Sequence, residues 1–135
     1  MNKQRGFTII ELIVVIAIIA VLAGIVLVNV TNYINKGKDA AAKGNLTSAL
    51  TNGAVYFDTN GNYTNFLTST GFTSVTTALT NAGYATTSSI VSGGTGWCAS
   101  VVLKATTTNS FCVDSTGKKV EAVTASATCA SGVCP

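Results

Sequence analysis

The most restrictive feature of this 135-residue chain is an apolar run over residues 7–28 that contains one charged side chain, Glu11. A helix that crosses the hydrocarbon core of a bilayer needs about 20 predominantly apolar residues, so the run is long enough to span a membrane. A carboxylate within such a helix costs roughly 2.5–3.5 kcal/mol on insertion scales. We therefore expect a partner group to compensate for the charge of Glu11.

Two cations, Lys3 and Arg5, precede the apolar run. Cationic residues beside a first membrane span stay on the cytoplasmic side, which predicts a cytoplasmic amino end and an extracytoplasmic remainder. A secretory signal peptide is the alternative, with a cleavage site at residues 21–23 and a mature chain that starts at Gly24. The apolar core of that signal would be long and would carry an acid, which argues against it.

At the start of the apolar run, Gly6 precedes Phe7, an apolar residue opens the run, and Glu11 is its fifth member. This junction resembles that of type IV pilin precursors. The resemblance implies that a prepilin peptidase cleaves after Gly6, so that residues 1–6 form a leader peptide, and that the same enzyme methylates the new amino terminus of Phe7. It also implies an assembly role for Glu11, with a platform protein and a cytoplasmic assembly ATPase as partners.

Charge balance supports the implied role of Glu11. Cleavage would create an ammonium group on Phe7 in or near the hydrocarbon layer, where an isolated charge of either sign is unfavourable. Staggered packing of identical helices can place the Glu11 carboxylate of one chain against the Phe7 ammonium of the next. Losing one partner of a buried ion pair typically costs about 3–5 kcal/mol, so the pair would report correct register. In the alternative, Glu11 extends to the nearby membrane surface.

Helical periodicity continues beyond the apolar run, which predicts one helix over residues 7–57 with a length of about 75 Å. No proline interrupts it, because Pro135 is the only proline in the chain. We expect residues 7–29 to cross the membrane and later to lie in a filament core. Residues 30–57 would then carry a globular head.

The sequence departs from the pilin pattern at one position of this helix. Many type IV pilins have a proline near position 28, where this chain has Val28. The helix therefore either stays regular there or loosens around Gly24. Glycine costs about 1 kcal/mol in a helix interior, so bending near Gly37 and Gly44 is a further alternative.

Three lysines, Lys36, Lys38 and Lys43, follow the apolar run. Basic residues beside a membrane commonly lie at the headgroup level or on a solvated helix face. Contact with DNA is the alternative for this patch. Removal of the leader leaves six basic and five acidic side chains, and this near balance disfavours a general nucleic-acid surface. We predict no specific nucleic-acid partner.

Residues 58–96 are rich in Thr, Ser, Asn and Gly and predict a connecting region with one short helix over residues 73–83. A calcium-binding loop that starts at Asp58 fails at two positions. Tyr63 stands where such a loop needs glycine, and Ser69 stands where it needs glutamate. We expect no metal in this region.

β-Branched and aromatic residues predict strands over residues 97–105, 109–114 and 120–123. The Ser-Thr-Gly-Lys turn before the last strand lacks the first glycine and the final hydroxyl of a phosphate-binding loop. We expect residues 97–135 to form three or four antiparallel strands. The predicted fold class is α+β: a long amino-terminal helix spans the membrane with its first half and packs with its second half against a small antiparallel sheet.

All four cysteines, Cys98, Cys112, Cys129 and Cys134, fall in the predicted sheet segment. Export would place them in an oxidising compartment, where an even number predicts disulfides worth about 2–4 kcal/mol each. Of three possible connectivities we favour Cys98 with Cys112 and Cys129 with Cys134. A four-residue hairpin turn would oppose the first pair, because it places Leu103 opposite Cys112. A zinc site is disfavoured by the spacing and by the absence of histidine.

An enzyme is disfavoured by the same composition. No histidine is present to act as a base, and the acids beyond the apolar run are dispersed at Asp39, Asp58, Asp114 and Glu121. We expect no catalytic residue, no metal and no cofactor.

The sequence therefore predicts a structural protein that resembles a type IV pilin precursor. It would cross the cytoplasmic membrane once and then join a helical homo-oligomeric filament at the cell surface or in the extracytoplasmic space. Within the family, the alternative is a pseudopilin of a type II-like secretion or DNA-uptake apparatus. From another class, the alternative is a monomeric membrane-anchored binding module.

Overall fold

A computed structural model of the chain describes residues 6–122, 129 and 132–135. Its elements are, in order, α1 (Ile9–Asn60), the 3-10 helix η1 (Phe66–Thr68), α2 (Thr70–Asn81), β1 (Thr86–Ile90), β2 (Trp97–Val102), β3 (Ser110–Asp114) and β4 (Lys119–Ala122). The strands form one antiparallel sheet in the order β1-β2-β3-β4. The predicted α+β class with a long amino-terminal helix is confirmed. The chain divides into two compact units, Met1–Ile34 and Asn35–Pro135.

The helix α1 contains 52 residues and continues through Gly24 and Val28 without interruption. The absence of proline at position 28 thus coincides with regular helix, as one of the two alternatives predicted. Gly61 ends α1: its φ of 72° is left-handed, and its N–H donates to the carbonyl of Phe57 at 2.7 Å. Glycine adopts this conformation without steric cost, which is why helices commonly end in this way.

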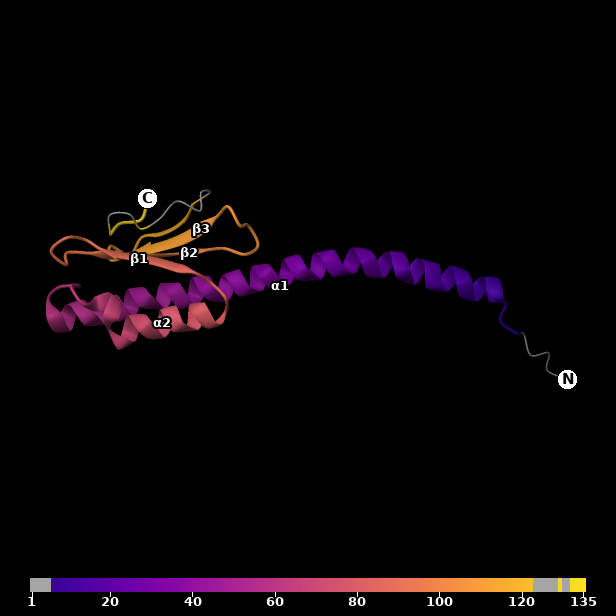
Figure 1. Ribbon diagram of the computed structural model, residues 1–135, viewed down its shortest axis with the longest axis horizontal. Helices are drawn as coiled ribbons and strands as arrows, with labels where there is room; N and C mark the ends of the chain where they lie inside the picture. Colours follow the sequence, from indigo (N-terminus) through magenta and orange to yellow (C-terminus); the bar gives the residue numbers. More distant parts are fainter. Residues whose placement is uncertain (1–5, 123–128, 130–131) are drawn as a thin grey trace. The chain divides into compact units, whose positions relative to one another are not determined.

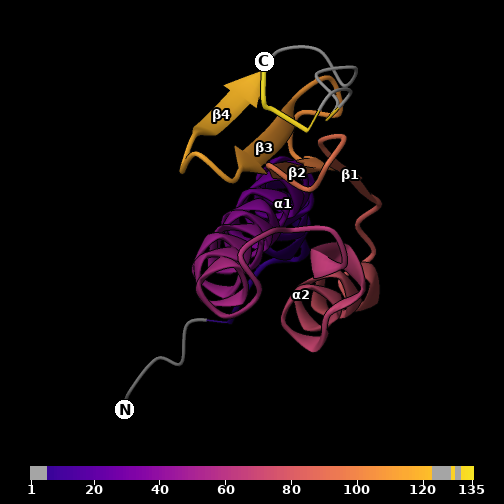
Figure 2. The same ribbon diagram turned by 90° about the vertical axis from the view of Figure 1, so that its left-hand side faces the viewer.

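The second unit is a two-layer arrangement. Figures 1 and 2 show the later part of α1 and the helix α2 on one face of the sheet. The helix α2 begins three residues before the predicted 73–83, because Ser69 caps it by accepting a hydrogen bond from the N–H of Phe72. The strand β1 lies inside the predicted connecting region 58–96. Its sequence, Thr-Thr-Ser-Ser-Ile, has no apolar alternation, so no periodic signal marked it.

Alternate residues of β2 and β3 form the core with the two helices. Trp97, Ala99 and Val101 of β2 and Phe111 and Val113 of β3 are buried in one cluster with side chains of α1 and α2. This period of two is the expected signature of a sheet face that packs on helices.

Trp97 is fully buried at the centre of this core, 4.8 Å from Phe66 and 5.9 Å from Phe72 between ring centroids. The helix α1 approaches the indole at Gly53. A Cβ atom at that position would lie 2.8 Å from Trp97 Nε1, closer than side chains tolerate. The contact between α1 and the sheet therefore requires glycine at position 53.

The opposite face of β2 and β3 carries Cys98 and Cys112, and the favoured disulfide pairing is wrong. The structure joins Cys98 to Cys129 and Cys112 to Cys134, with Cα separations of 5.5 and 5.8 Å. Residues 103–109 form a connection longer than the assumed turn, so that Ser100, and not Leu103, lies opposite Cys112. Cys98 and Cys112 are then diagonal neighbours, which lie about 7–8 Å apart. A disulfide needs Cβ atoms about 3.5–4.5 Å apart, so this pair is too distant.

Asp39 of α1 is buried and ties the helix to two loops. Its carboxylate accepts hydrogen bonds from the hydroxyl of Tyr84 at 2.6 Å and from the backbone N–H groups of Lys104 and Ala105, both at 2.8 Å. Burial raises the pKa of Asp39, but these hydrogen bonds together lower it by more than burial raises it. The net pKa therefore lies below the ordinary value of 3.8. Burial, followed by the bond to Asp39, raises the pKa of Tyr84.

The lowered pKa of Asp39 makes the second unit, Asn35–Pro135, which we call the head, less stable in acid. The charged form contributes stability above the unfolded pKa, and this contribution is lost as the pH falls from about 5 through the folded pKa. We expect Asp39→Asn to lower the free energy of unfolding at pH 7 by about 1.5–3 kcal/mol. The free energy of unfolding of the variant should also fall less steeply as the pH decreases below about 5. Denaturant unfolding of the full chain in detergent, followed by Trp97 fluorescence, measures both. Asp58→Asn, which removes an exposed carboxylate, is the control; equal pH profiles for the two variants would contradict the role of Asp39.

Two glycine-to-alanine changes in α1 should act with opposite sign. Gly53→Ala forces a methyl group against Trp97 and should destabilise the head by about 1–3 kcal/mol. At Gly44 the added Cβ lies within 4 Å of no described atom beyond the adjoining backbone of α1, so Gly44→Ala should stabilise the chain by about 0.5–1 kcal/mol through helix propensity alone. The same unfolding measurement compares them. Stabilisation by both changes would show that the indole contact is not tight.

Candidate functional site

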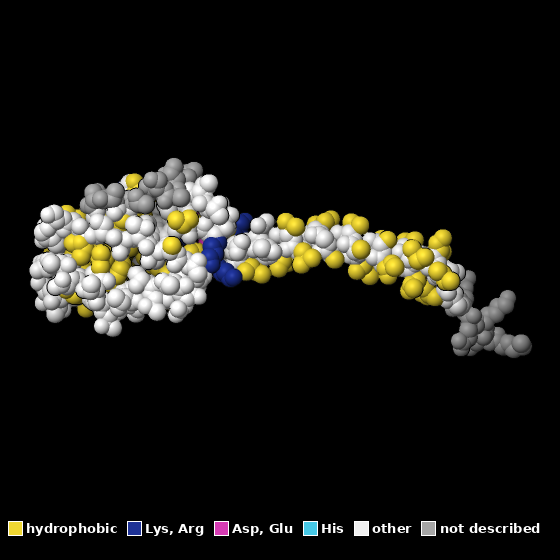
Figure 3. Space-filling view, in the orientation of Figure 1, with side chains coloured by type: hydrophobic (Ala, Val, Ile, Leu, Met, Phe, Trp, Pro, Cys, Tyr) yellow, Lys and Arg dark blue, Asp and Glu magenta, His cyan; other side chains and the backbone are white. Residues whose placement is uncertain are grey.

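The amino-terminal unit exposes nearly all of its apolar surface. Every residue from 6 to 34 is exposed, and an 18-residue window of α1 has a mean hydropathy of 3.2 with no part of it buried. Figure 3 shows hydrophobic side chains all along this part of the helix. Apolar surface of this extent needs cover by lipid or by other helices, and length and composition allow the helix to cross a membrane.

The bond between Gly6 and Phe7 lies in a non-helical segment just before α1. Phe7 is 80 % exposed, and apart from the two chain neighbours of Gly6 no atom of the described residues lies within 4 Å of the position that a Cβ on Gly6 would take. The predicted cleavage position is therefore open in the single chain. The rest of the predicted leader, including Lys3 and Arg5, lies outside the described residues.

Thr8 and Glu11 form a reciprocal cap at the start of α1. The backbone N–H and the hydroxyl of Thr8 donate to Glu11 Oε2 at 2.8 and 2.7 Å, and the N–H of Glu11 donates to Thr8 Oγ1 at 3.3 Å. Thr8 was not predicted from the sequence, although Thr-x-x-Glu before an apolar run is the signature of a capping box. Glu11 thus lies at the positive end of the helix dipole, which favours its charged form.

The cap gives Glu11 no counter-ion among the residues that the structure describes. Within residues 6–122, 129 and 132–135, no lysine or arginine forms an ion pair with Glu11. Both hydrogen bonds from Thr8 fall on Oε2, so in this described part of the chain Oε1 accepts none. One oxygen is therefore used within the chain, and the other is open to a cation from outside it.

The same segment matches known proteins. Residues 1–27 match the family described as the prokaryotic N-terminal methylation motif. The chain is 37 % identical over 70 residues to the type IV major pilin protein PilA of Myxococcus xanthus (strain DK1622), a match that covers 52 % of this chain and 32 % of the relative. It is 47 % identical over 51 residues to the type IV major alpha-pilin of Moraxella bovis, with coverage of 38 % and 32 %.

The resemblance to type IV pilin precursors is confirmed. The Moraxella bovis protein named fimbrial protein Q is 45 % identical over 51 residues, with the same coverage of 38 % and 32 %. The matched part thus spans about a third of the length of each of these curated relatives. No solved structure gives a significant match.

The lysines after the apolar run are partly neutralised by the head. Lys43 Nζ lies 2.5 Å from Glu121 Oε2, and this bond is the main cause that lowers the pKa of Glu121. Lys36 and Lys38 are exposed on α1 directly after the apolar run. Of the predicted patch, Lys43 is thus ion-paired with Glu121, and Lys36 and Lys38 are exposed.

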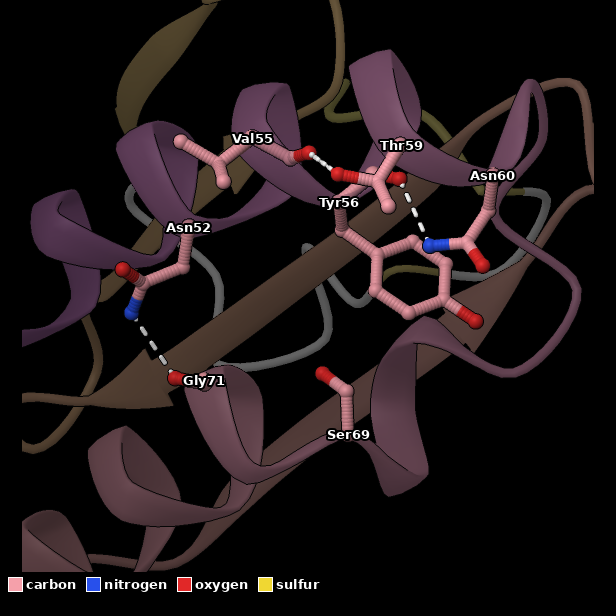
Figure 4. Close-up of a pocket in the computed structure, with 7 residues that line it drawn as sticks. All are labelled: Asn52, Val55, Tyr56, Thr59, Asn60, Ser69 and Gly71. Atoms are coloured by element: carbon pink, nitrogen blue, oxygen red, sulfur yellow. Dashed lines mark hydrogen bonds between the residues drawn. The ribbon is translucent and has the colours of Figure 1, made fainter.

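The described part of the chain contains no group of three or more His, Cys, Asp or Glu side chains placed to hold a metal ion. A surface hollow of about 330 Å³ lies between α1 and the start of α2 (Figure 4). Two of its side chains donate hydrogen bonds to backbone carbonyls of other lining residues. Asn52 Nδ2 donates to Gly71 at 2.8 Å, and Thr59 Oγ1 donates to Val55 at 2.9 Å. The residues that line it include no acid, lysine or cysteine.

The cap makes a prediction about the first turn of α1. Thr8→Val removes the hydroxyl that donates to and accepts from Glu11, and loss of a cap costs about 1 kcal/mol. We expect amide hydrogen exchange over residues 9–12 to become roughly fivefold faster in detergent micelles. Thr31→Val is the matched control, because the Thr31 hydroxyl donates to the carbonyl of Leu27, one turn back within α1. Unchanged exchange in Thr8→Val would rule out the cap.

Proposed function

We propose that the chain is the precursor of a filament subunit of the type IV pilin kind. The observation that carries the proposal is the methylation motif over residues 1–27, joined to an apolar helix that its own chain leaves uncovered. A monomeric anchored module would need the lipid cover but would not need this motif.

Processing would begin with hydrolysis of the peptide bond between Gly6 and Phe7. The products are a carboxylate on Gly6 of the leader and an amine on Phe7, which is then methylated. Thr8 and Glu11 both lie after the cut, so the capping box survives processing and keeps Glu11 at the start of the helix. The new ammonium group, on Phe7, is four residues before Glu11 in the mature chain.

Assembly would then pair charges between neighbouring chains. The open Oε1 of Glu11 accepts the Phe7 ammonium of the next subunit, while Oε2 keeps its bonds to Thr8. Packed side by side, the helices replace lipid with each other over residues 9–34, so the transfer from membrane to filament needs little exposure to water. The residues before the helix would stay in the cytoplasm until cleavage. The second unit would lie on the extracytoplasmic side of the membrane.

The proposed partners are those that this route requires. They are the prepilin peptidase, a platform protein and an assembly ATPase on the cytoplasmic side, and further copies of the chain in the filament. Lys36 and Lys38 would lie near the headgroups before assembly, where exposed cations are favoured by anionic lipid.

Glu11→Gln tests the assembly step. The amide keeps the size of the side chain but loses the charge, so we expect normal processing and at least about tenfold fewer fibres, given a loss of several kcal/mol for each broken pair. Electron microscopy of sheared fibres measures assembly, and mass spectrometry of the mature amino terminus measures processing.

Glu121→Gln is the matched control, because it removes one carboxylate from the head and should leave the fibre yield unchanged. Normal fibres from Glu11→Gln would refute the paired-charge mechanism. A mature chain that begins at Met1 or Gly24 would refute the proposed processing as well. Wild-type chains that are processed but absent from sheared surface fibres would favour a pseudopilin.

A further inference from the structure

On the face of the sheet opposite the helices, one buried carboxylate lies beside both strand cysteines. Asp114 is directly opposite Cys98 in the register of β2 and β3, and Cys112 precedes it by two residues on the same face. All three side chains are 0 % exposed. The assembly role proposed above makes no use of this carboxylate.

The two oxygens of Asp114 have different partners. Oδ1 accepts from the N–H and the hydroxyl of Thr116, at 2.9 and 2.5 Å, and from the N–H of Lys118 at 3.3 Å. These bonds hold the turn between β3 and β4. Oδ2 accepts from the backbone N–H of Cys134 at 3.0 Å. One oxygen therefore serves the turn, and the other holds a half-cystine from far along the chain.

Lys118 holds the other side of the same residue. Its Nζ donates to the carbonyl oxygens of Cys134 at 3.2 Å and of Pro135 at 2.6 Å. The main-chain N–H and C=O of Cys134 are thus both bound by side chains from the end of β3 and the following turn. This clamp places Cys134 within disulfide reach of Cys112, at a Cα separation of 5.8 Å.

We propose that Asp114, assisted by Lys118, is the positioning residue that selects Cys112 as the disulfide partner of Cys134. Cys98 and Cys112 are buried neighbours on one face, so burial alone does not decide which of them Cys134 meets. The clamp does, because it fixes the backbone of Cys134 on the β3 side. Cys129 is then left to form its disulfide with Cys98. Burial raises the pKa of Asp114 and the hydrogen bonds from Thr116, Cys134 and Lys118 lower it more, so the carboxylate is charged at neutral pH.

The chemistry is thiol–disulfide exchange with an oxidised low-molecular-weight disulfide such as glutathione disulfide. The Cys134 thiolate attacks one glutathione sulfur and expels a glutathione thiolate. The Cys112 thiolate then attacks the Cys134 sulfur of the mixed disulfide and expels the second. Two protein thiols lose two protons and two electrons, and one glutathione disulfide becomes two glutathione thiols. Asp114 takes no part in the electron transfer.

The test uses two backgrounds of the full chain in detergent, each with one disulfide. Cys98→Ser with Cys129→Ser keeps the pair Cys112–Cys134, and Cys112→Ser with Cys134→Ser keeps the pair Cys98–Cys129. The equilibrium between each pair and a glutathione redox buffer gives the effective concentration of its thiols. We expect Asp114→Asn to lower this value about tenfold for Cys112–Cys134, which is the loss of one charged hydrogen bond, and less than about twofold for Cys98–Cys129.

Asp58→Asn is the control and should change neither pair. Lys118→Gln alters an exposed side chain, so it should keep the fold and lower the Cys112–Cys134 value by roughly two- to fivefold. In the four-cysteine chain, refolding of Asp114→Asn should yield mispaired Cys98–Cys134 or Cys129–Cys134, found by tandem mass spectrometry of linked peptides. Equal losses in both backgrounds would reduce Asp114 to a general stabiliser, and no loss in either would overturn the proposal.

Discussion

A long apolar helix with no cover in its own chain is the constraint on which the rest of this structure depends. Residues 6–34 are exposed throughout, so a single copy in water is not a stable end state. Lipid and a bundle of identical helices are the two environments that satisfy such a surface. The capping box between Thr8 and Glu11 fits both, because it satisfies hydrogen bonds at the helix start and leaves one carboxylate oxygen for an external cation.

The head solves a different problem, which is how about one hundred residues make a stable unit around a four-stranded sheet. One sheet face packs on α1 and α2 around Trp97, and this close packing needs Gly53. The other face carries two half-cystines and the buried Asp114, and residues 129 and 132–135 reach it through two disulfides. Helix packing thus stabilises the first face of the sheet, and disulfides with a buried, charged hydrogen-bond network stabilise the second.

Sequence reasoning succeeded where a signal was local and strong. The apolar run, its helical period and the Gly6–Phe7–Glu11 junction led to α1 and to the pilin resemblance, because each depends on residues close together in the chain. It failed at β1, a strand of Thr and Ser that exists because β2 offers it a partner. It also failed at the disulfides, because the register of β2 against β3 makes Cys98 and Cys112 diagonal neighbours, and the spacing of cysteines in the sequence does not reveal which of them Cys129 and Cys134 reach. Thr8 had a local signature that was overlooked.

By itself, the sequence determined that this protein has an amino-terminal helix fit for a membrane or a helix bundle, and an isolated acid near its start. Hydropathy and helical period are additive properties of neighbouring residues, so no tertiary contact is needed to read them. The tertiary structure alone decided which cysteines pair, why Asp39 and Asp114 are buried, and why position 53 requires glycine. Each of these depends on atoms brought together from distant parts of the chain, where a register shift such as the three residues between Leu103 and Ser100 opposite Cys112 gives every side chain a different neighbour.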